Sequence, residues 1–344
     1  MENVQDSHIF GLLCTTFNII SEKENEFDDA VKPSIRHEAR PFNKYIIDCY
    51  KTWVTNKVFI FDENAISNLD QVYNILSDEE SKNVFDWLIM FKITSILTRD
   101  FNTAELLFPY PVNNDDSIED SEIKSDSNSN SFNVSNYKIY SESFEIIETW
   151  IYENYLLNGR CEPEQGDVVI DAGAFKGETS IWFADKTGIN GKVFAFEIVK
   201  SHLDLLVRNV KRNKLEDIIE IIDKGLLDEN KSVFVSQEGG ASSCSDYSKE
   251  LIADVIKLDT FIEENHLEKI DFIKMDIEGS ELAALKGAAG AIRMHKPKLA
   301  ICIYHKYEDI FEIPLFIKSL VPDYKIFISH KVPYSFGTVL FATT

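Results

Sequence analysis

The sequence predicts an α/β fold of the doubly wound type, in which helices cover both faces of a largely parallel sheet. From residue 168 onward, short apolar segments alternate with amphipathic segments of helical length. The apolar segments are nearly continuous, as expected for parallel strands that are buried on both faces. Ligands bind such sheets beyond the carboxyl ends of the strands, so we expect functional residues there.

Seven strands are expected in this part of the chain, at residues 168–170, 192–196, 218–222, 272–275, 299–304, 324–329 and 338–342. Helices are expected at residues 178–187, 200–213, 280–294 and 307–320. Residues 231–262 are expected to add a small hairpin and a helix between the third and fourth strands. One more helix, with apolar residues at helical spacing, is expected just before Gly159.

The chain before the sheet is expected to form a mostly helical accessory region at residues 1–111. Ser77 and Glu80 have the spacing of a capping box, and apolar residues at helical spacing follow them. A helix is therefore predicted at residues 78–93. Residues 57–61 have the composition of a strand.

A polar segment separates this region from the α/β domain. Residues 112–136 are rich in Ser, Asn and acidic residues, and few of them are apolar. Because such a segment has little to bury, we expect an acidic, mobile linker. Residues 137–344 then form the second domain.

The composition limits the partners and the compartment. The chain has 58 acidic and 35 basic residues, a net charge of −23, which disfavours nucleic acid as a partner because binding to phosphates depends on Lys and Arg. The sequence has no signal-like start and no long apolar segment, and its five cysteines form no C-x-x-C pair. We therefore expect a cytoplasmic protein without a membrane span, a disulfide framework or a zinc site.

A glycine turn follows the first strand, in the segment Asp171-Ala-Gly-Ala-Phe-Lys-Gly177. Gly173, followed by Ala174, permits a tight turn and a close approach of the backbone to a ligand. Gly177 opens a helix whose N–H groups favour a carboxylate. Asp171 is a candidate partner for the amino group of a methionine moiety. The turn lacks the third glycine of dinucleotide-binding turns, and a purely structural turn is the alternative.

Polar residues also follow the second and third strands. Glu197 ends the second strand, where a carboxylate accepts hydrogen bonds from ribose hydroxyls. This indicates an adenosine-containing cofactor but does not distinguish S-adenosylmethionine from NAD, and a solvated acidic residue is the alternative. Asp223, Lys224 and Gly225 follow the third strand and are candidates, by position, for contact with adenine.

Two carboxylates mark the end of the fourth strand. Asp276 follows the strand directly, and Glu278 follows two residues later. A carboxylate at this point can orient an acceptor hydroxyl and receive its proton. The alternative is that the two acids only complement the dipole of the next helix.

Several segments together resemble FkbM-type S-adenosylmethionine-dependent methyltransferases. They are the glycine turn, Glu197, residues 255–260, and the segment Phe272-Ile-Lys-Met-Asp-Ile-Glu-Gly-Ser-Glu281, with weaker support from residues 303–306 and 312–315. The resemblance covers roughly residues 155–344. It implies a Rossmann-like class I fold with a seven-stranded sheet whose last strand is antiparallel.

The resemblance also implies S-adenosylmethionine as the cofactor and O-methylation as the reaction. The expected acceptor is a sugar hydroxyl in a surface glycan, a glycolipid or a nucleotide sugar, or else a hydroxyl of a secondary metabolite. Residues matching the family motif would bind the cofactor, namely Asp171, Gly173, Gly177 and Glu197. Asp276 would face the transferred methyl group.

Two histidines are candidates for the base that removes the hydroxyl proton. His305 follows the fifth strand and His330 follows the sixth, so both are expected at the same edge of the sheet as Asp276. A metal ion held by Asp276, His305 and Asp309 would be another way to acidify a hydroxyl. We expect no metal, because no aspartate pair follows the fifth strand.

Other interpretations stay open. An NAD-dependent oxidoreductase or epimerase is disfavoured by the missing glycine and by the absence of a Tyr-x-x-x-Lys pair. A binding module without catalytic activity is a further alternative. The segment Gly239-Gly-Ala-Ser-Ser-Cys244 would form either a lid over the cofactor or the tip of a hairpin.

Overall fold

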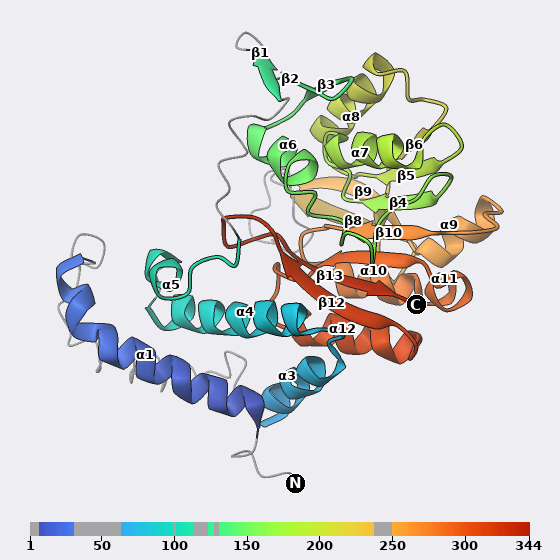
Figure 1. The fold of residues 1–344 in the computed structure, drawn as a ribbon. Coiled ribbons are helices and arrows are strands. Elements are labelled where there is room, and N and C mark those ends of the chain that lie inside the picture. Colours follow the sequence, from blue (N-terminus) through green and yellow to red (C-terminus); the bar gives the residue numbers. More distant parts are fainter. Residues whose placement is uncertain (1–6, 31–62, 99–100, 113–122, 127–130, 237–249) are drawn as a thin grey trace. The chain divides into compact units, whose positions relative to one another are not determined.

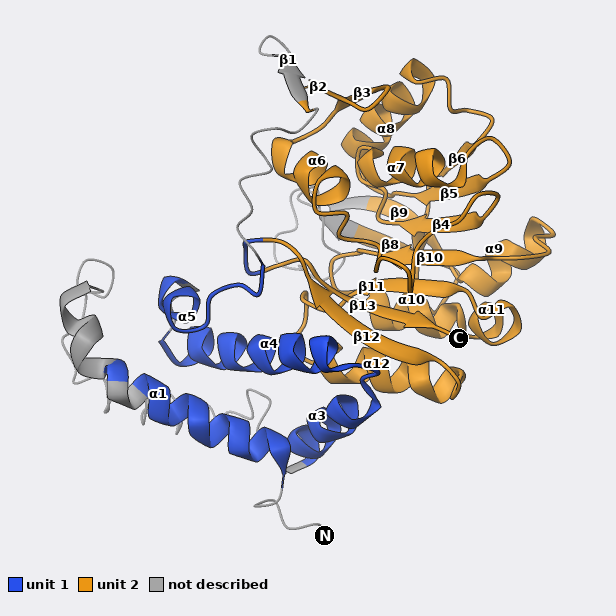
Figure 2. Cartoon of the chain, in the orientation of Figure 1, with its two compact units in different colours: residues 1–112, 333–335 blue, residues 113–332, 336–344 orange. Residues whose placement is uncertain are grey.

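The computed structural model describes residues 7–30, 63–98, 101–112, 123–126, 131–236 and 250–344. Two compact units make up the chain (Figure 2). Residues 1–112 and 333–335 form the smaller unit, and residues 113–332 and 336–344 form the larger one. Among the described residues, none of the helices has the length and apolar character that crossing a membrane requires.

The smaller unit is helical in its described parts. Its helices are α1 (His8–Ala30), α3 (Glu63–Ile75), α4 (Glu79–Thr98) and α5 (Phe101–Leu107). At the start of α4, the carboxylate of Asp78 accepts a hydrogen bond of 2.8 Å from the backbone N–H of Ser81, so the N-cap lies one residue after the expected Ser77. The indole of Trp87 donates to the carbonyl of Phe108 and ties α4 to the residue after α5. The strand expected at 57–61 lies outside the described residues.

The larger unit is built on a seven-stranded sheet in the order β12-β13-β11-β10-β4-β5-β6 (Figure 1). The strands are β4 (Val168–Ala172), β5 (Lys192–Phe196), β6 (Ile219–Ile222), β10 (Phe272–Met275), β11 (Lys298–Cys302), β12 (Lys325–His330) and β13 (Thr338–Thr343). The last strand, β13, is antiparallel to both of its neighbours, and the remaining pairs are parallel. The predicted fold class is confirmed.

Two groups of helices cover this sheet. The first group comprises α6 (Ser143–Trp150), α7 (Glu178–Thr187) and α8 (Lys200–Arg212), and the second comprises α9 (Leu258–Glu264), α10 (Glu281–Gly287), α11 (Ala289–His295) and α12 (Asp309–Leu320). The middle strands are almost wholly buried, as the continuous apolar segments predicted. The helix expected at 280–294 is instead two helices that meet at Ala288, because Gly287 and Gly290 weaken the helix there.

Two small sheets accompany the large one. In the first, β1 (Lys124–Asp126), β2 (Ser131–Val134) and β3 (Tyr137–Tyr140) are antiparallel. In the second, β9 (Glu250–Ile256) lies between β7 (Gly225–Leu226) and β8 (Lys231–Ser236). The latter, followed by α9, agrees with the hairpin and helix expected at 231–262. Residues 239–244, expected to be a lid or a hairpin tip, lie outside the described residues.

The segment expected to be a linker contains two of these strands. Within 112–136, the described residues form β1 and β2, and the side chain of Val134 is buried beside Ile139 of β3. Two asparagines hold β3 in place, Asn209 of α8 and Asn213 directly after that helix: the amide oxygen of each accepts a backbone hydrogen bond of 2.9 Å from β3. A few apolar residues at the end of the polar segment therefore suffice for strand pairing.

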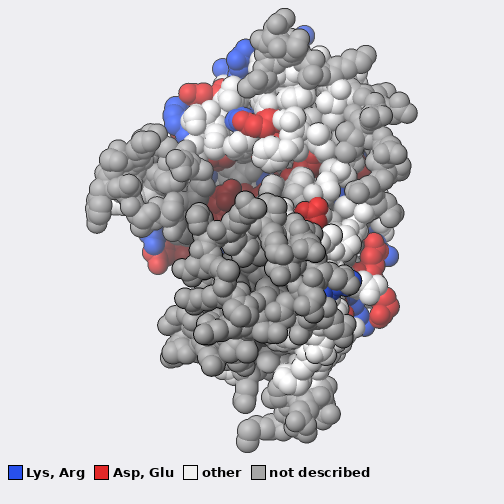
Figure 3. Space-filling model, turned by 90° about the vertical axis from the view of Figure 1, so that its left-hand side faces the viewer, with Lys and Arg blue, Asp and Glu red and all other residues white. Residues whose placement is uncertain are grey.

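The strand order reverses between β4 and β10. These strands are neighbours in the sheet, with Ala172 opposite Met275, although about a hundred residues separate them in the sequence. A crevice forms at such a point, beyond the carboxyl ends of the two strands. On the face drawn in Figure 3, the Lys and Arg side chains of the described residues lie singly or in small groups and form no broad basic surface.

Candidate functional site

A cavity of about 600 Å³ lies at the carboxyl ends of β4, β5 and β10. Six of the residues predicted from the sequence line it: Gly173, Glu197, Lys224, Gly225, Asp276 and Glu278. Six others are not among its lining residues: Asp171, Ala174, Gly177, Asp223, His305 and His330. Half of the residues proposed from the sequence therefore line this cavity, and the other half do not.

The glycine turn brings the ends of β4 and β10 together. Gly173 has a φ of +77°, and a Cβ atom at this position would lie 1.8 Å from the carbonyl oxygen of Asp276. Glycine is therefore required at position 173 because the backbone of Asp276 packs directly against it. Gly177 has a φ of +95° and caps α7, with the side chain of Leu206 packed against it.

Asp171 is buried and its charge is satisfied within the protein. Its Oδ2 accepts hydrogen bonds from the hydroxyls of Thr179 (2.8 Å) and Ser180 (2.6 Å). The ammonium group of Lys274 lies 3.2 Å from Oδ1 and also donates to the carbonyl of Gly173. Asp171 is buried, bonded to these partners and absent from the lining of the cavity. Its position therefore does not favour the expected contact with the amino group of a methionine moiety.

Glu197 is held by the backbone around it. One carboxylate oxygen accepts hydrogen bonds from the backbone N–H groups of Ile198 and Val199, and the other accepts one of 2.9 Å from Phe175. The side chain of Glu197 is therefore fixed at the cavity wall. Its two carboxylate oxygens can accept about four hydrogen bonds, so part of this capacity remains for a ligand.

Asp276 follows β10 and is the centre of a hydrogen-bonded cluster. The hydroxyl of Tyr155 donates to Oδ2 at 2.8 Å, and the hydroxyl of Tyr304 donates to Oδ1 at 2.9 Å. Burial by itself would raise the pKa of Asp276. The charges of Lys274 and His305, together with the two phenol hydrogen bonds, outweigh burial and lower this pKa. Asp276 is therefore ionised at neutral pH.

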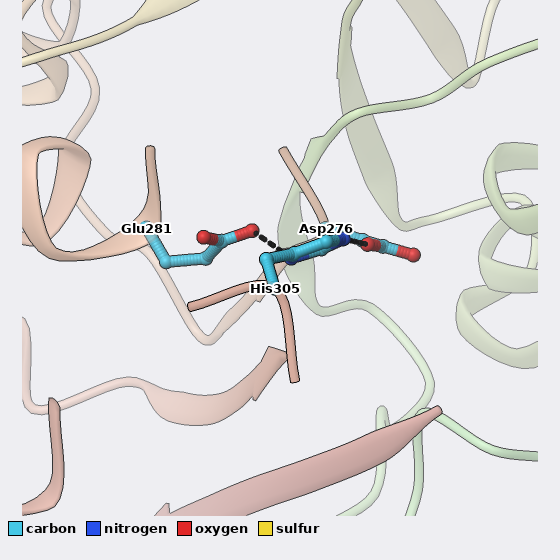
Figure 4. Close-up of side chains that lie close together, drawn as sticks. All are labelled: Asp276, Glu281 and His305. Atoms are coloured by element: carbon cyan, nitrogen blue, oxygen red, sulfur yellow. Dashed lines mark ion pairs between the residues drawn. The ribbon is translucent and has the colours of Figure 1, made fainter. Parts of the chain in front are cut away.

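His305 lies behind Asp276, between two carboxylates (Figure 4). Its Nδ1 is 3.0 Å from Oε1 of Glu281, and its Nε2 is 3.4 Å from Oδ1 of Asp276 and 3.6 Å from Oε2 of Glu278. Burial alone would lower the pKa of His305. The contact with Glu281 and the three negative charges outweigh burial and raise this pKa to about 9.

The same three residues form a possible metal-binding group. One ligand atom each of Asp276, Glu281 and His305 lie within 4.8 Å of one another. Asp309, which was considered only as a ligand in the alternative with a metal ion, accepts the backbone N–H of Lys306. A metal ion needs an unprotonated imidazole nitrogen. A ring whose two nitrogens each lie within 4 Å of a carboxylate fits the positively charged imidazolium better than the neutral ring, because the charges attract.

The structure does not bring His330 to the cavity. His330 ends β12, the edge strand, and its Nδ1 lies 2.8 Å from the hydroxyl of Thr338 on β13. Strand β13 inserts between β11 and β12, so His330 lies two strands away from the end of β11, which His305 follows. The adjacency of His330 to Asp276 that the chain order suggested is therefore wrong.

Several residues of the site escaped the sequence interpretation. Glu178 directly follows the glycine turn, Lys274 lies inside the segment Phe272–Glu281, and Tyr304 directly precedes His305. Their positions were therefore visible in the sequence although their roles were not. Glu145 of α6 and Tyr155 in the following turn also line the cavity. No motif marks these two, and only the packing of α6 against α7 reveals them.

Comparison with known proteins agrees with this geometry. Residues 171–324 match the model of the methyltransferase FkbM domain. The matched region includes the glycine turn, Glu197, Asp276 and α12. A search of curated proteins gives no match.

Solved structures show the same fold. The crystal structure of methyltransferase FkbM from Methylobacillus flagellatus KT matches with 23% identity and a TM-score of 0.55. The match covers 81% of this chain but only 59% of that one, so the present chain spans less than two thirds of its relative. An O-methyltransferase from Bacillus cereus in complex with SAH matches more weakly, with 15% identity, 59% and 92% coverage and a TM-score of 0.35. The match to the Methylobacillus flagellatus structure shows a class I methyltransferase-like fold.

Proposed function

We propose that this protein is an S-adenosylmethionine-dependent O-methyltransferase that acts on a sugar hydroxyl of a surface glycan, a glycolipid or a nucleotide sugar. We assign the activity to residues 137–344 and an accessory role to residues 1–111. One observation carries the proposal: the glycine turn, Glu197 and Asp276 line a single cavity. The match of residues 171–324 to the methyltransferase FkbM domain supports methyl transfer, and the resemblance of the motifs supports a sugar hydroxyl as acceptor.

The residues of the cavity fit the cofactor. Glu197 is fixed by three backbone N–H groups and would accept hydrogen bonds from the ribose hydroxyls. Lys224 and Gly225 line the adjoining wall, where they would contact the adenine. Glu178 places a buried carboxylate oxygen without a hydrogen-bond partner near the glycine turn, which suits a ligand with N–H donors. When bound, S-adenosylmethionine supplies an electrophilic methyl group on a positively charged sulfur.

Asp276 is the proposed proton acceptor. Its carboxylate is ionised and held by Tyr155 and Tyr304, and each oxygen keeps acceptor capacity for a hydroxyl in the cavity. The low pKa makes Asp276 a weak base toward a resting alcohol. As the new C–O bond forms, however, the hydroxyl proton becomes strongly acidic, and a weak base suffices to receive it. Positioning of the hydroxyl is therefore the main contribution of Asp276.

His305 has a different role from the base expected from the sequence. With its pKa raised to about 9, the ring is protonated on both nitrogens at neutral pH, so it cannot accept a proton from a hydroxyl. It is not among the lining residues of the cavity. We assign His305 as a positioning residue: its protonated Nε2 attracts the carboxylates of Asp276 and Glu278 and holds them in place.

Two measurements test the proposal. Calorimetric titration should show binding of S-adenosylmethionine and of S-adenosylhomocysteine but not of NAD. Mass spectrometry with a deuterated methyl donor should show a labelled product when sugar nucleotides or cell-envelope glycans are offered as acceptors. Binding of NAD alone would favour an oxidoreductase, and binding of none of these ligands would exclude the proposed function.

A matched pair of variants tests the reaction site. Asp276→Asn should lower turnover by about a hundredfold or more, since positioned proton transfer contributes on that order. Its affinity for S-adenosylhomocysteine should change far less. Glu220→Gln removes a charge on β6, outside the cavity, and serves as the control. Equal turnover of the two variants would contradict the role of Asp276.

A further inference from the structure

Two exposed phenylalanines from distant parts of the chain lie together in the larger unit. Phe144 belongs to the first turn of α6, and Phe336 to the turn between β12 and β13. Their ring centroids are 6.5 Å apart, and the ring planes meet at 82°. Phe144 remains 44% exposed and Phe336 42% exposed, so the two rings cover each other only in part. Large apolar side chains that gather at a surface in this way mark a place where a ligand binds.

This aromatic corner, defined as Phe144 and Phe336, adjoins the end of the cavity at Asp276. The ring of Tyr304 lies 6.4 Å from that of Phe336, and its hydroxyl donates to Oδ1 of Asp276. On the side of α6, Glu145 directly follows Phe144 and lines the cavity. A single side chain therefore connects the corner to the carboxylate proposed to receive the hydroxyl proton.

An aromatic corner beside an ionised carboxylate matches the two kinds of surface that a sugar ring presents. The hydroxyls at the edge of a sugar ring need hydrogen-bond acceptors, and the oxygens of Asp276 keep acceptor capacity. The C–H groups on the face of the ring carry partial positive charge. They pack favourably on the face of an aromatic ring, which is electron-rich. A binding site with apolar walls and a few placed polar groups has the usual composition of a small-molecule site.

The charges around Asp276 disfavour a phosphate group on the acceptor. Glu278 lines the same part of the cavity and adds a second carboxylate. The ammonium groups of Lys176 and Lys274, which also line the cavity, are paired with carboxylates of the protein. Lys224 follows β6, on the wall proposed for the adenine. Because phosphates bind where cations are available to them, an uncharged acceptor fits this end of the cavity better.

We propose that Phe144 and Phe336 form an acceptor subsite that takes an uncharged sugar ring, with the face of the ring on the aromatic corner. The inference rests on the proposed function and narrows its acceptor. A neutral sugar of a glycan or glycolipid fits this subsite, and a nucleotide sugar, with its two phosphates, does not. Phe144 and Phe336 come from α6 and from the turn before β13, so the subsite exists only once both segments pack on the domain.

The test measures the binding of matched sugars by saturation-transfer NMR, with the full chain saturated by S-adenosylhomocysteine. The probes are the methyl glycosides of glucose, galactose and mannose, paired with UDP-glucose, UDP-galactose and GDP-mannose. At least one methyl glycoside should bind, and more tightly than its nucleotide sugar. Phe144→Ala and Phe336→Ala should each weaken this binding about fivefold or more, as expected for a lost stacking contact. Their affinity for S-adenosylhomocysteine should change less than about twofold.

Two kinds of control accompany these variants. Phe144→Tyr and Phe336→Tyr keep the aromatic faces and should retain most of the affinity for the glycoside, which separates stacking from a general loss of shape. Phe234→Ala removes an exposed phenylalanine from β8 and should leave the affinity unchanged. Catechol provides a flat aromatic ligand for comparison.

Three results would overturn the subsite while the proposed function stands. They are failure of all three glycosides to bind, with or without binding of catechol, tighter binding of the nucleotide sugars, and equal losses in the three alanine variants. In each case the unaltered protein would still bind S-adenosylhomocysteine and form a labelled methyl product. Failure of the unaltered protein to bind S-adenosylhomocysteine would overturn both the subsite and the proposed function.

Discussion

The Nδ1 atom of His305 lies 3.0 Å from Oε1 of Glu281, a fully buried carboxylate at the start of α10. Glu281 is itself fixed, since the same oxygen accepts the backbone N–H of Ile277. Glu281 therefore fixes the orientation of the imidazole ring, and Nε2 faces Asp276. This contact links the loop after β11 to the start of α10, and it contributes to the raised pKa of His305.

Replacement of this carboxylate should release the histidine. In Glu281→Gln, the pKa of His305 should fall from about 9 by about one unit or more, because a buried opposite charge is lost while the amide can still accept the Ile277 N–H. NMR titration of the ring measures the change. Glu278→Gln removes a more exposed carboxylate at 3.6 Å and should give a smaller shift. Equal shifts in the two variants would contradict the dominance of Glu281.

The raised pKa of His305 also predicts a pH dependence of stability. The folded-state pKa is above the unfolded value, so the stabilisation is fully present below about pH 6.5 and is lost as the pH rises through about 9. With the side chain only 10% exposed, this amounts to at most about 3 kcal/mol. Urea unfolding at about pH 6 and about pH 10 should show a difference between the unaltered protein and His305→Asn that shrinks with pH. A difference independent of pH would refute the prediction.

A side chain at Gly173 should be incompatible with the fold. In Gly173→Ala, the Cβ would lie 1.8 Å from the backbone of Asp276, in addition to the strain of a positive φ, and we expect a loss of several kcal/mol. Gly159→Ala is the matched control, since Gly159 has a φ of +68° and nothing lies within 4 Å of its Cβ position. It should cost only about 1–2 kcal/mol. Chemical denaturation of both variants checks the difference.

The buried Lys274–Asp171 pair should behave as a unit. Lys274→Met leaves a buried carboxylate without its cation and should cost about 3–5 kcal/mol in urea unfolding. Adding Asp171→Asn to this variant should recover part of the loss, because no unpaired charge then remains. Lys200→Met, which breaks a pair exposed on α8, should cost at most about 1 kcal/mol. Additive losses in the double variant would argue against direct coupling.

The phenol hydrogen bonds to Asp276 should appear in the pH profile. Tyr304→Phe and Tyr155→Phe each remove a donor to the carboxylate and should raise the pKa of Asp276. Because the ionised form is the active one, the acid limb of the turnover profile should move to higher pH. An unshifted acid limb with reduced turnover would indicate that the tyrosines act only by packing.

The sequence was sufficient for the sheet and for the position of the site. The limits of β5 and β10 agree with the prediction, and the others differ at their ends, because apolar runs between turn residues define a buried strand locally. Asp276 and Glu197 were found because the carboxyl end of a strand is also a local property. The sequence interpretation missed the break between α10 and α11 and the strands within 112–136. Local sequence signals are weak in both segments, and packing against the rest of the fold determines their structure.

What the sequence determined by itself was thus the class of fold, its FkbM-type motifs and the two loops that carry the glycine turn and Asp276. Only the tertiary structure decided which polar residues face the cavity. Burial turned Asp171 inward, the insertion of β13 moved His330 away, and the packing of α6 brought Glu145 to the cavity. The physical reason is that strand formation depends on neighbours along the chain, whereas exposure and charge pairing depend on neighbours in space.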